Sequence, residues 1–122
     1  MSELSVNAMA VATVVCVIAN VSIAVADLAP ARFVLANSAE VGLSRRALPY
    51  LAGLKAAGAV GLALGLAGFT PLGLAAAAGL SLFYLGAVGA HVRASVFYNI
   101  AFPMVFLALA LCAVGYFAAR LA

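Results

Sequence analysis

Charged side chains are scarce in this sequence, and their scarcity argues against a soluble protein. They make up 7% of the chain, whereas apolar residues make up 69%. A soluble domain has about 25% charged and about 45–50% apolar residues. A soluble fold of 122 residues could not hide so much apolar surface from water, whereas in a bilayer lipid covers the outside of the fold. We therefore predict one all-helical integral membrane domain over residues 1–122.

The sequence also lacks the patterns that many chemical functions need. Its six Lys and Arg residues form no basic patch with interleaved aromatic residues, which argues against a nucleic-acid partner. Cys16 and Cys112 belong to no CxxC pair and lie in apolar runs, so we interpret both as buried hydrophobes. The sequence contains no complete catalytic constellation and no set of residues with metal-ligand spacing. We expect a protein that is not an enzyme and holds no metal.

Long apolar runs are the main feature that is present. A spanning helix needs about 20 mostly apolar residues, and residues 6–26 form such a run. A cleaved signal peptide would begin with basic residues, whereas residues 2–5 are not basic, so we predict that this run is a retained membrane helix. The uncharged stretch 56–90 would be about 52 Å long as one helix, too long for one crossing. It contains Thr70-Pro71, and proline interrupts a helix. We predict four spans, at 6–26, 48–69, 71–90 and 96–119, with a mild kink at Pro103.

The segment between the first two spans, residues 27–47, holds most of the charge. Pro30 is suited to open a short helix there and Gly42 to end it. Phe33, Val34 and neighbouring apolar residues would give that helix an apolar side. We predict a short interfacial helix packed against the membrane surface. An ordered loop without a helix is the alternative.

The arginines predict the orientation of the bundle. The side of the first and third loops carries four of them, Arg32, Arg45, Arg46 and Arg93. Only Arg120 lies on the side of the termini. Short loops rich in Lys and Arg stay in the cytoplasm, so we predict a plasma-membrane protein with these loops inside and both termini outside. The predicted anchors of the cytoplasmic face are Asp27, Arg45, Arg46, His91 and Arg93.

Small residues recur every four positions along the two middle spans. They are Gly53, Ala57, Gly61 and Gly65 on one span and Gly73, Ala77 and Ser81 on the other. Such stripes let helices approach closely within a membrane. We favour packing inside one bundle, because a tight turn makes these two helices neighbours. A homo-oligomer or another membrane protein as partner is the alternative.

Several polar residues are predicted to lie at one depth in the cytoplasmic half of the bundle. Lys55 lies about 10 Å inside the second span, at 1.5 Å per residue. Counted from the same face, Asn20 and Tyr84 lie at a similar depth, and Asn99 begins the fourth span. Asp27 is the carboxylate that could reach Lys55. We consider three interpretations of this polar layer: a Lys55 side chain that snorkels to the headgroups, a structural hydrogen-bond network, or a site for a headgroup, quinone ring or ion.

The second and third spans resemble those of a known family. Residues 48–62, LPYLAGLKAAGAVGL, are similar to the second helix of DoxX-like membrane proteins. Pro71-Leu72-Gly73, Gly79-Leu80 and residues 84–93, YLGAVGAHVR, follow in the order and spacing of the family. Pro103, which opens a last helix rich in Leu and Ala, also fits. The resemblance covers roughly residues 45–115 and implies a four-helix membrane bundle.

The resemblance says less about activity, because most members of the family have none assigned. The family takes its name from a subunit associated with a terminal quinol oxidase, and some relatives are linked to thiol or oxidant defence. A Glu or Lys commonly stands at the position of Lys55, and His91 and Arg93 match an HxR ending. An acidic residue often follows that ending, but here Ala94-Ser95-Val96 follows.

We therefore expect a non-enzymatic accessory or scaffold subunit of a membrane complex, of the redox or respiratory kind. A small transporter or a lipid- or quinone-binding bundle is the alternative. Small multidrug transporters need a carboxylate in their first span, and here Asn20 is the only strongly polar group inside that span. We expect no cofactor unless the bundle binds a quinone or a lipid.

Overall fold

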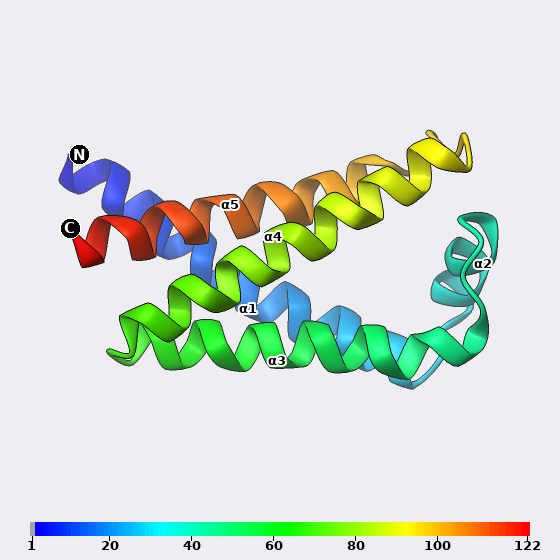
Figure 1. Cartoon of the computed structure of the whole chain (residues 1–122), viewed down its shortest axis with the longest axis horizontal. Coiled ribbons are helices and arrows are strands. Elements are labelled where there is room, and N and C mark those ends of the chain that lie inside the picture. Colours follow the sequence, from blue (N-terminus) through cyan, green and yellow to red (C-terminus); the bar gives the residue numbers. More distant parts are fainter. Residues whose placement is uncertain (1) are drawn as a thin grey trace.

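The computed structural model describes residues 2–122, which fold into helices and short connections. The elements are α1 (Glu3–Leu28), α2 (Arg32–Glu40), the 3-10 turn η1 (Arg45–Ala47), α3 (Leu48–Leu66), α4 (Thr70–Arg93) and α5 (Ala101–Leu121). The four long helices form a bundle in the cyclic order α1, α3, α4, α5, in which each packs against two neighbours. Both termini lie at the end of the bundle that holds the α3–α4 turn, and α2 lies at the other end (Figure 1).

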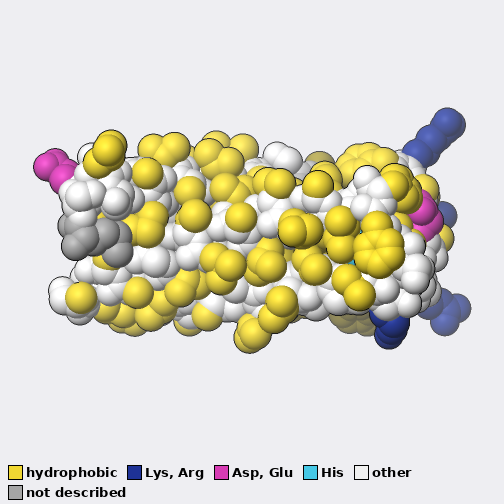
Figure 2. All heavy atoms as spheres, turned by 90° about the horizontal axis from the view of Figure 1, so that it is seen from above, with side chains coloured by type: hydrophobic (Ala, Val, Ile, Leu, Met, Phe, Trp, Pro, Cys, Tyr) yellow, Lys and Arg dark blue, Asp and Glu magenta, His cyan; other side chains and the backbone are white. Residues whose placement is uncertain are grey.

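The long helices have the properties of membrane spans. All four are long and apolar enough to cross a bilayer, which confirms the predicted four-span fold. Figure 2 shows apolar side chains along the flank of the bundle and basic side chains at the α2 end. This distribution suits lipid around the sides and water or headgroups at the end. The protein is a multi-pass membrane protein, and the predicted short helix between its first two spans is present as α2.

Three helices end through the same left-handed turn. The residues that follow α2, α3 and α4 adopt positive φ angles at Gly42 (83°), Gly68 (123°) and Ser95 (57°). After each turn the chain closes a hydrogen bond back onto the helix, as from Val96 N to His91 O at 2.9 Å. Gly68 makes the tight turn before Thr70, so α3 ends at Leu66, three residues before the predicted boundary at residue 69. At its other end, α4 continues to Arg93, beyond the predicted boundary at residue 90.

The fourth span begins later than the sequence predicted. Residues 96–100 look like part of an apolar run, but they form the α4–α5 connection, and α5 starts at Ala101. The turn at Ser95 redirects the chain, so the start predicted at residue 96 is wrong. Pro103 consequently lies in the first turn of α5, where backbone N–H groups have no helical partner and proline breaks no hydrogen bond. The expected kink therefore has no cause there.

Small residues seal the bundle near the α3–α4 turn. A Cβ added to Gly65 would lie 2.8 Å from the Phe117 ring, and one added to Gly73 would lie 2.6 Å from it. A Cβ on Gly61 would lie 2.6 Å from that of Ala76. These contacts are too short for any side chain larger than hydrogen, so the glycines let α3, α4 and α5 meet. Gly61 and Gly65 thus pack within one bundle, whereas Gly53, in the same stripe, faces open space.

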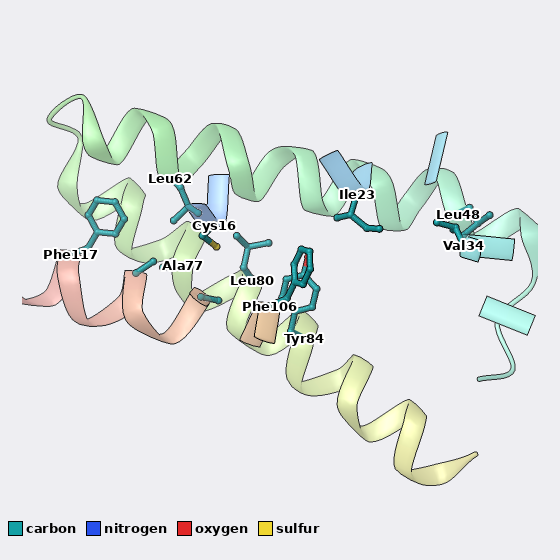
Figure 3. Packing of buried hydrophobic residues seen from close by; sticks show 12 residues of the cluster. Cys16, Ile23, Val34, Leu48, Leu62, Ala77, Leu80, Tyr84, Phe106 and Phe117 are labelled. Atoms are coloured by element: carbon teal, nitrogen blue, oxygen red, sulfur yellow. The ribbon is translucent and has the colours of Figure 1, made fainter. Parts of the chain in front are cut away.

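The buried core continues from this seal toward the middle of the bundle. Phe117, Leu62 and Cys16 are fully buried. Farther along, the Tyr84 and Phe106 rings lie side by side with centroids 5.1 Å apart (Figure 3). Beyond Tyr84, toward α2, apolar packing gives way to a cavity with polar groups in its wall.

Candidate functional site

A cavity of about 580 Å³ lies at the α2 end of the bundle. Its wall includes residues of α1, α2, α3, α4 and the first turn of α5. Apolar side chains dominate it, among them Ile23, Leu51, Phe83 and Phe102. Ligand pockets in proteins are typically apolar cavities of about 300–1,000 Å³ with a few polar groups that orient the ligand. The polar groups of this wall decide what the cavity can bind.

A buried ion pair forms one part of the wall. Lys55 Nζ donates to Asp27 Oδ2 at 2.7 Å, joining α3 to the last turn of α1. The two residues are 8% and 3% exposed. A carboxylate at a helix C-terminus opposes the helix dipole, so the Lys55 charge offsets an unfavourable position as well as a buried one. The Lys55 ammonium also lies 5.6 Å from the centre of the Phe83 ring. Lys55 therefore points into the bundle and does not snorkel to the surface.

A second polar contact lies at the inner end of the cavity. The Tyr84 hydroxyl of α4 donates to Asn20 Oδ1 of α1. Asn20 Nδ2 donates in turn to the Cys16 backbone oxygen at 2.8 Å and contacts its sulfur at 3.4 Å. Asn20 and Cys16 are fully buried. The contact satisfies the polar atoms of Asn20 and fixes the Tyr84 ring against Phe106.

Two hydrogen bonds hold α2 against the α4–α5 connection. The Tyr98 hydroxyl donates to Glu40 Oε1 at 2.6 Å, and Asn99 Nδ2 donates to Asn37 Oδ1 at 2.8 Å. The bond to the Glu40 carboxylate raises the pKa of Tyr98, because losing the phenol proton would break it. Sequence reasoning missed Asn37 and Glu40, since both look like solvated polar residues of a surface helix. Together these contacts place α2 over the cavity.

His91 contributes a polar atom that has no partner. Its Nδ1 lies 2.9 Å from the Ala87 backbone oxygen, one turn back in α4. The residue is 3% exposed and lines the cavity, and its Nε2 has no hydrogen-bond partner. Asn99 Oδ1, another buried atom of the cavity wall, also lacks one. Buried polar atoms without partners are rare in native proteins and ask for an explanation.

The structure separates the predicted site residues into two sets. Asn20 contacts Tyr84, and Lys55 contacts Asp27, the carboxylate expected to reach it. Asn20 and Asp27 are seven residues apart in α1, so these are two separate contacts at different depths. Asn99 was predicted to share that layer, but it precedes α5 and bonds to α2 instead. It still lines the same cavity as Lys55 and Tyr84.

The predicted anchors also separate. Arg45, Arg46 and Arg93 are exposed at the α2 end. Asp27 and His91 are buried, so their prediction as surface anchors is corrected. The physical reason is that α2 covers this end of the bundle. Asp27 and His91, at the ends of their apolar runs, therefore lie in the interior beneath it.

The arrangement is chemically suited to holding an amphipathic molecule. The apolar wall would accept a ring or an acyl chain, and the polar atoms would orient its head. Within residues 2–122, no three His, Cys, Asp or Glu side chains are grouped so that they could hold a metal ion. The cavity therefore offers hydrogen bonds and one ion pair, on largely apolar walls.

Comparison with known proteins identifies the family. The sequence model of the DoxX-like family matches residues 11–113, from α1 into α5. All the residues that line the cavity fall within that match. No curated protein and no solved structure matches the chain. With most of its length covered by the family match, the chain belongs to the DoxX-like family.

Proposed function

We propose that this protein binds an amphipathic molecule, a lipid or a quinone, in the cavity under α2, and catalyses no reaction on it. The cavity carries the proposal: about 580 Å³ of largely apolar space with a buried ion pair in its wall. Charged side chains inside a membrane protein cost free energy, and where they occur they commonly mark a functional site. Here it borders a space of the right size and polarity for a ligand.

The polar wall offers groups for either ligand. The Lys55 ammonium has three N–H donors, and Asp27 accepts from one of them. The remaining donors suit the carbonyl of a quinone or the ester oxygen of a lipid. The apolar residues of α2 and α4 would cover the ring or the first part of an acyl chain. A bound quinone would supply redox chemistry that this chain's own residues do not.

Three glycines of α4 allow a matched test of this proposal. A Cβ at Gly79, Gly86 or Gly89 would meet no atom within 4 Å, so leucine can be introduced at each without a clash at Cβ. Only Gly86 lines the cavity. The protein is purified in mild detergent and its bound lipids and quinones are measured by mass spectrometry. We expect Gly86→Leu to lose a ligand that the wild type and Gly89→Leu retain. Equal ligand content in all three proteins would refute the proposal.

A second observation favours an accessory role in a membrane complex. A shallow apolar groove follows the α3–α4 seam and includes Ala57, Gly61, Ala76 and Gly79. Small residues on a lipid-facing seam allow a helix of another protein to approach. In the same purifications, Gly79→Leu should lose a stoichiometric protein partner while Gly86→Leu keeps it. If no partner is present in the wild type, the accessory role is rejected.

The orientation proposed for the bundle places α2 and the cavity on the cytoplasmic side of the plasma membrane. Four exposed arginines support it, namely Arg32, Arg45, Arg46 and Arg93. The opposite end has Arg120. Positive loops are retained in the cytoplasm. A C-terminal reporter that is active only in the cytoplasm should therefore be silent, and an active reporter would reverse the assignment.

A further inference from the structure

The unpartnered atoms of the cavity wall limit what its ligand can be. His91 Nδ1 lies 2.9 Å from the Ala87 carbonyl oxygen. A carbonyl oxygen only accepts hydrogen bonds, so Nδ1 must carry the proton. In the neutral imidazole the other nitrogen, Nε2, is then an acceptor. His91 is more than nine-tenths buried, and Nε2 has no partner.

Asn99 presents a second acceptor in the same wall. Its Nδ2 donates to Asn37 Oδ1 at 2.8 Å, which leaves Oδ1 as the free atom. That oxygen is buried and has no partner. The two atoms come from α4 and from the α4–α5 connection, so a local irregularity of one helix does not explain both. Both residues line the cavity that also contains Lys55.

We infer that the polar end of the ligand carries a hydroxyl group, which donates a hydrogen bond to His91 Nε2. The inference rests on the proposed function and narrows its ligand class to hydroxyl-bearing amphiphiles. A hydroxyl also accepts, so the same head can use a donor of the Lys55 ammonium. An oxidised quinone and a phosphatidylcholine headgroup have no O–H donor and would leave Nε2 unsatisfied. A hydroxylated ring and a glycerol headgroup share the required chemistry.

The single histidine of the chain makes Nε2 directly observable. The protein is labelled with ¹⁵N at histidine only and placed in nanodiscs of dioleoylphosphatidylcholine, a lipid without hydroxyl groups. Three probes are added in turn: 4-octylphenol, its methyl ether, and monooleoylglycerol. Before addition, the spectrum should show a neutral ring protonated at Nδ1. A hydroxyl probe should then move the Nε2 resonance upfield and saturate, while Nδ1 changes little.

The probes distinguish the sources of the hydroxyl. A response to 4-octylphenol alone supports a ring hydroxyl, and a response to monooleoylglycerol alone supports a lipid headgroup. The methyl ether keeps the ring and chain but cannot donate, so it should bind about tenfold more weakly than the phenol, the factor that one buried hydrogen bond supplies. Gly86→Leu should abolish the response, and Gly89→Leu should preserve it.

Three results would overturn the inference, and the first of them leaves the proposed function standing. If the ether binds as tightly as the phenol and Gly86→Leu blocks both, the cavity binds amphiphiles but needs no hydroxyl. If no probe binds and Gly86→Leu changes no co-purifying ligand, both proposals fail. An Nε2 that already carries a proton without ligand also contradicts the inference, because it would then be a donor.

Discussion

The two ends of the bundle use the same helices in opposite ways. At the turn end, Gly65 and Gly73 let α3 and α4 approach until the Phe117 ring covers both. From that turn α3 and α4 diverge toward the α2 end (Figure 1). There they enclose a cavity with the Lys55–Asp27 pair in its wall. The smallest residues close one end, whereas the other end contains a cavity and is joined by a few polar contacts.

This difference indicates how so small a membrane protein can combine stability with a binding site. Close packing is a main source of attraction between helices in lipid, so the turn end supplies much of the cohesion. The α2 end contains a cavity where such packing would be, and its helices are joined by an ion pair and a few hydrogen bonds. Three predictions test this division, in order of the effect expected.

The ion pair should produce the largest loss, because either residue alone leaves a buried charge. Asp27→Leu or Lys55→Met should lower the free energy of unfolding by about 3–5 kcal/mol, and the double variant should recover most of it. Unfolding in SDS measures each value. Glu3→Gln, which alters an exposed carboxylate at the opposite end of α1 from Asp27, serves as the control. Single variants as stable as the wild type would mean that the α2 end does not depend on this pair.

The glycine seal should respond to a single methyl group. Gly65→Ala places Cβ against the Gly73 backbone and the Phe117 ring, and should destabilise the protein by about 1–3 kcal/mol. Gly86→Ala, where Cβ meets no atom within 4 Å, should leave stability unchanged or slightly raised. The same unfolding assay compares the two variants. Equal effects at both positions would remove the contrast between a packed end and an open one.

The turn after α4 should give the smallest effect, and a gain. Ser95 has a φ of 57°, which is strained for a residue with a side chain. Ser95→Gly relieves that strain but makes the unfolded chain more flexible, so we expect a net gain of about 0.5–1 kcal/mol. Thermal denaturation in detergent is the measurement. A loss of stability would show that the Ser95 side chain has a role that its backbone angle does not reveal.

The sequence predicts the bundle well because membrane spans depend on apolar length. The runs at 6–26 and 48–90 and the Thr70-Pro71 break are visible in the residues alone. Counting depth from one face also predicts that Asn20 and Tyr84 lie at a similar depth, because helices of regular rise convert position into depth. It identifies Asp27 as the carboxylate within reach of Lys55.

The cavity could not be predicted in the same way. It exists because α2 folds over the end of the bundle, and the contacts that hold α2, such as Tyr98 to Glu40, join residues far apart in sequence. The largely apolar residues 96–100 gave no sign of the turn at Ser95, so α5 was expected too early and Asn99 was placed in the wrong layer. His91 was taken for an anchor because it ends an apolar run, whereas its burial depends on packing.

Photo-crosslinking with a diazirine-bearing, hydroxyl-containing lipid tests the central claim most directly, since it reports where an amphiphile resides. The account predicts cross-links concentrated on residues that line the cavity, such as Phe33 and Phe83, with loss of these cross-links in Gly86→Leu but not in Gly89→Leu. Cross-links spread evenly over the lipid-facing flanks, at both ends and unchanged by Gly86→Leu, would contradict it.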